Sequence, residues 1–132
     1  MKHFSLIILV LLAVLTVNIY AQNNNQNVPN IKPTVTAGDL VFVAQTLNTV
    51  ELRGNEVETF VAVKNAIKPY LDKIQNDKLQ ATSNLELNLP LTTAQNLITF
   101  LERAKISGAE AERYKRFVDS FINAAKAASG QK

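Results

Sequence analysis

The sequence contains no cysteine and no tryptophan, and its only histidine is His3. Without cysteine there can be no disulfide bond and no thiolate nucleophile. A single histidine cannot supply the set of nitrogen and sulfur ligands that zinc sites use. The fold must therefore be stabilised by packing alone, and only carboxylates could support catalysis or bind a hard metal ion.

Glycine and proline are also scarce, with four of each in 132 residues. No glycine-rich phosphate loop is present, and no serine stands in a nucleophile-elbow sequence. We therefore predict no catalytic, cofactor-binding or metal-binding residues, and we expect the protein not to be an enzyme.

Charge of one sign is not in excess. The formal net charge is +3 and falls to +2 if Lys2 is removed with an N-terminal signal. Lysine, arginine and acidic residues alternate along the chain, which does not favour a nucleic acid partner. We expect an unknown protein or envelope component as partner, and the sequence leaves the oligomeric state open.

The N-terminus has the pattern of an export signal. The basic start Met1-Lys2-His3 precedes an apolar run from Phe4 to Val17, and Ala21 offers a small residue for cleavage. We interpret residues 1–21 as a signal peptide and expect a periplasmic or secreted protein that meets the membrane only through this segment. An uncleaved membrane anchor is the alternative, because the apolar run approaches the length of a spanning helix.

Residues 22–34 are rich in asparagine and glutamine and contain two prolines. Such a composition offers little apolar surface to offset the entropy of ordering, so we predict a disordered spacer. Residues 35–130 then form one helical domain.

Apolar residues in this domain recur at helical spacing, and one local pattern occurs twice. Leu52-Arg53-Gly54-Asn55-Glu56 returns as Ile106-Ser107-Gly108-Ala109-Glu110. Each copy is typical of a helix, a tight turn and a second helix. We therefore predict an all-α fold, a small four-helix bundle made of two helical hairpins that could be an internal repeat by duplication or by convergence. The expected helices are 36–51, 55–76, 92–105 and 108–128.

Residues at the expected helix starts fit known caps. Ser107 with Glu110, and Thr92 with Gln95, match the capping box, and Glu56 keeps half of that pattern in the first turn. Thr36 with Asp39 fits the start of the first helix. We expect Gly54 and Gly108 to provide a positive φ and close helix approach.

Leucines alternate with polar residues between the second and third helices, at Leu85, Leu87 and Leu89. A lone strand would have no partner here, so we expect an extended strap. Its leucines either seal one side of the bundle or form a surface for a partner.

Three functions from different classes remain. The first is a non-catalytic module that binds a protein or envelope component, and the second is a set of amphipathic helices that associates with lipid. The third, a carboxylate-dependent enzyme, would have to pool the first-turn glutamates of the two hairpins. Helix capping explains those glutamates without catalysis, so the binding module is the function that we expect.

Overall fold

The computed structural model describes residues 28–130, so the expected signal peptide and residues 22–27 of the expected spacer lie outside it. The described chain is mostly helical, as predicted, and also contains short strands. Its four α-helices lie within a few residues of their expected positions. They are α2 (Ala37–Leu47), α3 (Val57–Asn76), α4 (Leu91–Leu101) and α5 (Ala111–Ala128).

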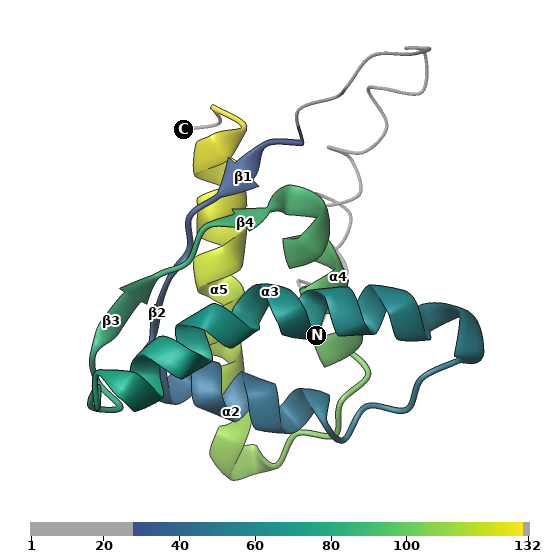
Figure 1. The fold of residues 1–132 in the computed structure, drawn as a ribbon, viewed down its shortest axis with the longest axis horizontal. Coiled ribbons are helices and arrows are strands. Elements are labelled where there is room, and N and C mark those ends of the chain that lie inside the picture. Colours follow the sequence, from purple (N-terminus) through teal and green to yellow (C-terminus); the bar gives the residue numbers. More distant parts are fainter. Residues whose placement is uncertain (1–27, 131–132) are drawn as a thin grey trace.

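The helices cross one another around a shared interior. Figure 1 shows α2 and α3 running across the molecule, while α5 stands upright behind them. The α3 helix packs mainly on α4, and α2 contacts both α3 and α5. Helix α3 continues through Pro69, so the expected single helix over 55–76 is confirmed.

Four short strands form two antiparallel pairs. They are β1 (Asn30–Ile31), β2 (Thr34–Thr36), β3 (Asn84–Glu86) and β4 (Leu89–Pro90), with β1 paired to β4 and β2 to β3. The two pairs share one register, since Ile31 lies opposite Leu89 and Val35 lies opposite Leu85. Between them, the Leu87 N–H donates to the Pro33 carbonyl at 2.9 Å. Pro33 has no N–H to return that bond, so one continuous ribbon is divided into two short pairs.

The ribbon corrects the prediction of a disordered spacer over 22–34 for the part that the structure describes, residues 28–34. Asn30–Ile31 and Thr34 lie in strands, and the Ile31 side chain is buried. Ile31 and Pro33 face the interior together with Val35, while Lys32 and Thr34 are exposed. This alternation is the pattern of a half-buried strand. The asparagine-rich composition of the preceding residues concealed it.

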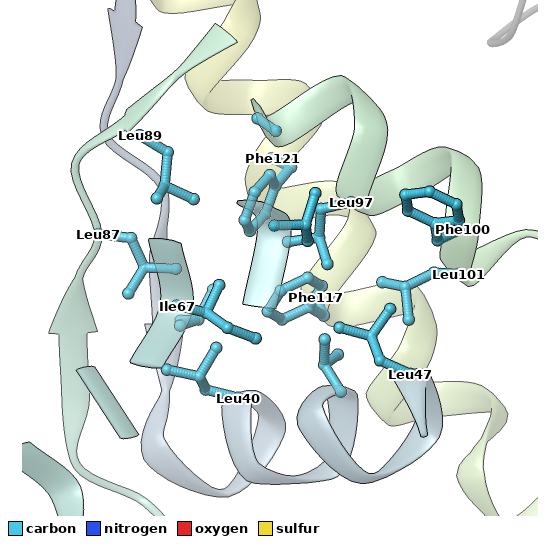
Figure 2. Packing of buried hydrophobic residues seen from close by; sticks show 14 of the residues in the cluster. Leu40, Leu47, Ile67, Leu87, Leu89, Leu97, Phe100, Leu101, Phe117 and Phe121 are labelled. Atoms are coloured by element: carbon cyan, nitrogen blue, oxygen red, sulfur yellow. The ribbon is translucent and has the colours of Figure 1, made fainter. Parts of the chain in front are cut away.

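The leucine segment is the other strand of this ribbon, so the prediction that it has no partner is wrong. Leu85, Leu87 and Leu89 are all buried, and the polar residues between them are exposed. Figure 2 shows Leu87 and Leu89 pointing from the strand into the core. The expectation that they form a partner surface is therefore wrong, and the alternative that they seal the core is confirmed. Pairing with residues 30–36 fixes which face of the segment turns inward.

The core joins all four helices and the ribbon (Figure 2). The rings of Phe117 and Phe121 lie 4.7 Å apart, and those of Phe60 and Phe100 meet edge to face at 5.2 Å. Phe42, which lies off the main stripe of its helix, is also buried. Apolar residues that recur at helical spacing in all four helices are buried: Val43, Leu47, Phe60, Ile67, Leu97, Leu101, Phe117 and Phe121.

The start of α4 differs from the predicted capping box. The helix begins at Leu91 with Pro90 as its N-cap, and no side chain caps it. Thr92 and Gln95 therefore lie inside the first turns, and their expected roles are wrong. The reason is the ribbon, because β4 leads directly into the helix and the Leu91 N–H donates to the Pro29 carbonyl at 2.9 Å.

Candidate functional site

The two repeated sequence patterns adopt the same local backbone. Each forms a short 3₁₀ turn, η1 (Gly54–Glu56) or η2 (Gly108–Glu110), directly before a long helix. The residue before each turn is extended, with φ and ψ of −85° and 152° at Arg53 and −73° and 158° at Ser107. These turns were candidates both for structural caps and for pooled glutamates.

The glutamates of both turns act as caps. Glu56 Oε2 accepts the Arg53 N–H at 2.8 Å, and Glu110 Oε2 accepts the Ser107 N–H at 3.1 Å. The Ser107 hydroxyl donates to the same carboxylate oxygen at 2.8 Å. The Glu half of the predicted capping box is therefore formed in both turns, while the serine binds the glutamate side chain.

Gly54 and Gly108 do not have the role that the sequence suggested. Neither has a positive φ, and a Cβ built on either would meet no atom within 4 Å. Both residues open a 3₁₀ turn with right-handed geometry. The chain instead reverses over residues 48–53 and 102–107, where the preceding helices have already ended.

Arg103 fastens the first turn to the end of α4. Its Nη1 donates to Glu56 Oε1 at 2.7 Å, and its Nη2 donates to the Glu51 carbonyl. The Arg103 hydrogen bond is the main reason why the pKa of Glu56 lies below its usual value, with the Arg53 amide as the next. The pKa of Glu110 is lowered chiefly by the Ser107 hydroxyl. Each carboxylate is thus held by a hydrogen-bond donor of its own turn, and Glu56 also by Arg103.

The first-turn glutamates do not converge on a shared site. Within residues 28–130, no three acidic or histidine side chains are grouped so that they could hold a metal ion. Glu56 faces Arg103, whereas Glu110 faces its own cap. The arrangement is that of two separate helix starts.

A different acidic residue, Asp39 on α2, is the most distinctive polar group of the described chain. Its side chain is only 3% exposed. Its backbone N–H donates to Thr36 Oγ1 at 3.1 Å, which confirms Thr36 as the N-cap of α2. Its two carboxylate oxygens accept from Arg116 on α5, Oδ2 from Nε and Oδ1 from Nη2, both at 2.7 Å. This is the bidentate geometry that arginine forms with carboxylates.

A second arginine lies beside this pair. Arg113 Nε is 3.9 Å from Asp39 Oδ1, and its guanidinium carbon is 5.9 Å from the centre of the Phe42 ring. The side chains of Arg113 and Arg116 are 47% and 56% exposed. The hydrogen bond to Asp39 is the main reason why the pKa of Arg116 is raised. We call Asp39, Phe42, Arg113 and Arg116 the arginine cluster.

Sequence reasoning placed Asp39 only at a helix start and did not connect it with Arg113 or Arg116. A signal for the cluster was present, because Asp39 precedes Val43 by four positions and Leu47 by eight. A carboxylate on the buried stripe of a helix requires a cationic or hydrogen-bonding partner. The sequence contained no information on which of the basic residues that partner was.

No known family, no curated protein and no solved structure matches this chain. Over residues 28–130, none of the helices has both the length and the apolar composition needed to cross a membrane. The fold defines a small, mostly helical domain with one two-stranded ribbon. Its function has to be argued from the arginine cluster and the remaining surface.

Proposed function

We propose that this chain is an exported, non-catalytic module that binds a protein or envelope component through the outer face of α5. Export is supported by the basic start, the apolar run and the small residue at Ala21. In this proposal residues 1–21 are removed and the mature protein begins at Gln22. It then acts in the periplasm or outside the cell.

The observation that carries the binding role is the arginine cluster. The large apolar side chains with substantial exposure in residues 28–130 are Val28, Val57 and Val61. Three exposed valines, of which Val57 and Val61 lie one helical turn apart on α3, are too few for the contiguous apolar patch of a hydrophobic docking surface. Arg113 and Arg116 are half exposed yet already held in place by Asp39 and Phe42. Arginine is enriched where proteins bind their partners, so we assign recognition to this face.

We further propose that the two helical hairpins descend from one duplicated unit. The support is the shared order of 3₁₀ turn, capping glutamate and long helix after Arg53 and after Ser107. The hairpins differ in the contacts of their turns, since Arg103 binds the glutamate of the first turn and not that of the second. The arginine cluster joins the two hairpins, since Asp39 and Phe42 lie on α2 and the two arginines lie on α5, and it has no counterpart in the repeated pattern.

Site-specific photo-crosslinking in the cells that produce the protein tests the binding role. A crosslinking amino acid at position 112, beside the arginine cluster, should yield a defined adduct. The matched control at position 65, on the exposed side of α3, should yield none. Equal crosslinking from both positions, or from neither, would contradict recognition through α5. Mass spectrometry of the exported protein should find Gln22 at its N-terminus, and an intact Met1 would favour the membrane anchor instead.

A further inference from the structure

We propose that Arg113 and Arg116 form a binding site for a phosphate group, with buried Asp39 as the residue that positions them. This inference rests on the proposed function, because it names the chemical group that the α5 face would recognise.

Both guanidinium groups are positioned before any ligand binds. Arg116 is fixed by two hydrogen bonds of 2.7 Å to a carboxylate that is 3% exposed. Arg113 lies over the Phe42 ring and near the same carboxylate. Immobilising a long side chain on binding is costly, and that cost is reduced when the side chain is already ordered. A ligand that binds the cluster would therefore have to immobilise little of either arginine side chain.

Most of the N–H donors of the pair form no hydrogen bond with residues 28–130 and remain for a ligand. A guanidinium has about five N–H donors, and Arg116 uses two of its set on Asp39. The Arg113 Nε contact of 3.9 Å is too long to be a hydrogen bond. Two cations face one buried carboxylate. Two adjacent arginine forks match the charge and the several oxygens of a phosphate group.

Arg113 is the residue that a purely structural role does not explain. Both oxygens of Asp39 already have a donor from Arg116. No buried side-chain nitrogen or oxygen in the described part of the chain lacks a hydrogen-bond partner. The link between α2 and α5 is therefore complete without Arg113, whose charge adds to that of Arg116 at the surface.

Two acidic residues oppose an anion at this site: Glu110, which interacts electrostatically with Arg113, and Glu112. The Glu112 side chain interacts electrostatically with Arg116 from the preceding turn of α5, and the residue is exposed. It would repel a phosphate group and compete for the same donors. The neighbouring Lys115 is paired with Asp119 and is 76% exposed. Glu112 and Lys115 therefore provide matched variants. Removing the Glu112 charge should improve phosphate binding, and removing the Lys115 charge should leave it unchanged.

The test is a titration of the ¹⁵N-labelled exported protein with inorganic phosphate, with chloride at equal ionic strength as control. The arginine Nε–H signals of Arg113 and Arg116 should shift and saturate, with a Kd on the order of 1 mM. Arg113→Ala should weaken binding about tenfold or more, which corresponds to about 1.4 kcal/mol. The fold should survive in this variant because the Asp39–Arg116 pair remains.

The control variants separate a specific site from general charge attraction. Lys115→Ala removes the same charge as Arg113→Ala and should bind phosphate like the wild type, whereas Glu112→Gln should bind it about threefold more tightly, because a repelling charge is removed. Shifts that never saturate, or equal loss in Arg113→Ala and Lys115→Ala, would overturn the proposal. So would weaker binding by Glu112→Gln.

Vesicles distinguish a lipid phosphate from a soluble one. Phosphatidylcholine vesicles with and without phosphatidic acid should be compared for the wild type and Arg113→Ala. Binding that requires both phosphatidic acid and Arg113 assigns the phosphate to a lipid, whereas binding of inorganic phosphate alone assigns it to a soluble ligand. Vesicle binding that is equal in the wild type and Arg113→Ala would contradict the site. If crosslinking at position 112 persists while no phosphate binds, the proposed binding role is supported and the proposed phosphate site is wrong.

Discussion

Lys78 has an uncommon backbone conformation at the end of α3. It is the only residue other than glycine with a positive φ, at 51°, within residues 28–130. The Leu79 N–H donates to the Ile74 carbonyl at 3.0 Å and the Lys78 N–H to the Gln75 carbonyl at 3.3 Å. This is the Schellman arrangement, in which glycine usually occupies the left-handed position.

Lys78→Gly should therefore stabilise the protein by about 1 kcal/mol, because the left-handed conformation costs a residue with a Cβ about that much. Urea denaturation measures the change. Asp77→Gly is the control, since Asp77 has a right-handed φ of −86° and should gain nothing. A loss of stability in Lys78→Gly would mean that the lysine side chain contributes more than its backbone costs.

The glycines of the two turns lead to a prediction opposite to the one that sequence alone supports. Gly54→Ala and Gly108→Ala should be neutral or stabilising by about 0.4–1 kcal/mol, because the backbone is compatible with alanine and the unfolded chain loses freedom. Gly38→Ala should destabilise, since its Cβ would lie 3.0 Å from the Ala81 carbonyl oxygen. Thermal unfolding of the three variants checks this order, and the reverse order would contradict it.

Glu56 should make stability depend on pH in the acidic range. Its pKa is lower in the folded protein than in the unfolded chain, so its contribution is complete above the unfolded pKa of about 4.3. The contribution is lost as the pH falls through the folded value. Urea unfolding from about pH 6 to about pH 3 should show Glu56→Gln less stable at the upper end and the two proteins converging at the lower end.

Arg103→Ala is the companion variant, because Arg103 is the largest cause of the Glu56 shift. Arg103→Ala should remove much of the dependence of stability on pH that Glu56 causes. If the free energy of unfolding falls in parallel with pH in the wild type and in Glu56→Gln, the Arg103 contact does not form in solution.

At the scale of elements, helices were predictable and the ribbon was not. Helical periodicity is a local pattern, so the stripes that contain Val43, Ile67 and Phe117 identified the buried faces correctly. Strand pairing joins residues that are far apart in the sequence. The alternation at Leu85–Leu89 was visible, but nothing near it indicated that Ile31–Val35 would be its partner. The start of α4 was misplaced for the same reason.

The ribbon is testable through one buried and one exposed position of the same strand segment. Ile31→Ala should cost about 2–5 kcal/mol, as truncation of a buried isoleucine does. Thr34→Ala, on the exposed face, should change stability by less than about 0.5 kcal/mol. The free energy of unfolding in urea gives both values. If Ile31→Ala has no effect, residues 22–34 are a spacer after all.

For the whole molecule, the shared core predicts one cooperative unfolding transition. Residues of α2, α3, α4, α5 and the ribbon belong to a single buried cluster, so no element has a core of its own. Circular dichroism of the purified protein should show one thermal transition and no gain of helix on anionic liposomes. Several transitions, or helix that forms only on liposomes, would favour the lipid-associating alternative.

The arginine cluster shows what sequence can and cannot predict about a site. The spacing of Asp39 on its stripe indicates a buried carboxylate, and the helical phase of Arg113 and Arg116 indicates their common face. The meeting of these two helices is a property of the tertiary fold. It depends on how α2 and α5 cross, which no local pattern encodes.

The ribbon also has a consequence for the order of folding. Ile31 pairs with Leu89, so the first described strand cannot form until the chain up to β4 is available. During synthesis from the N-terminus, the apolar residues Ile31 and Val35 are made early and remain unpaired until β4 has been made. Such distant pairing slows folding relative to a bundle of purely local hairpins. Until β4 is available, Lys32 and Pro33 protect this segment from association, because a charge and a missing N–H both discourage strand pairing with another chain.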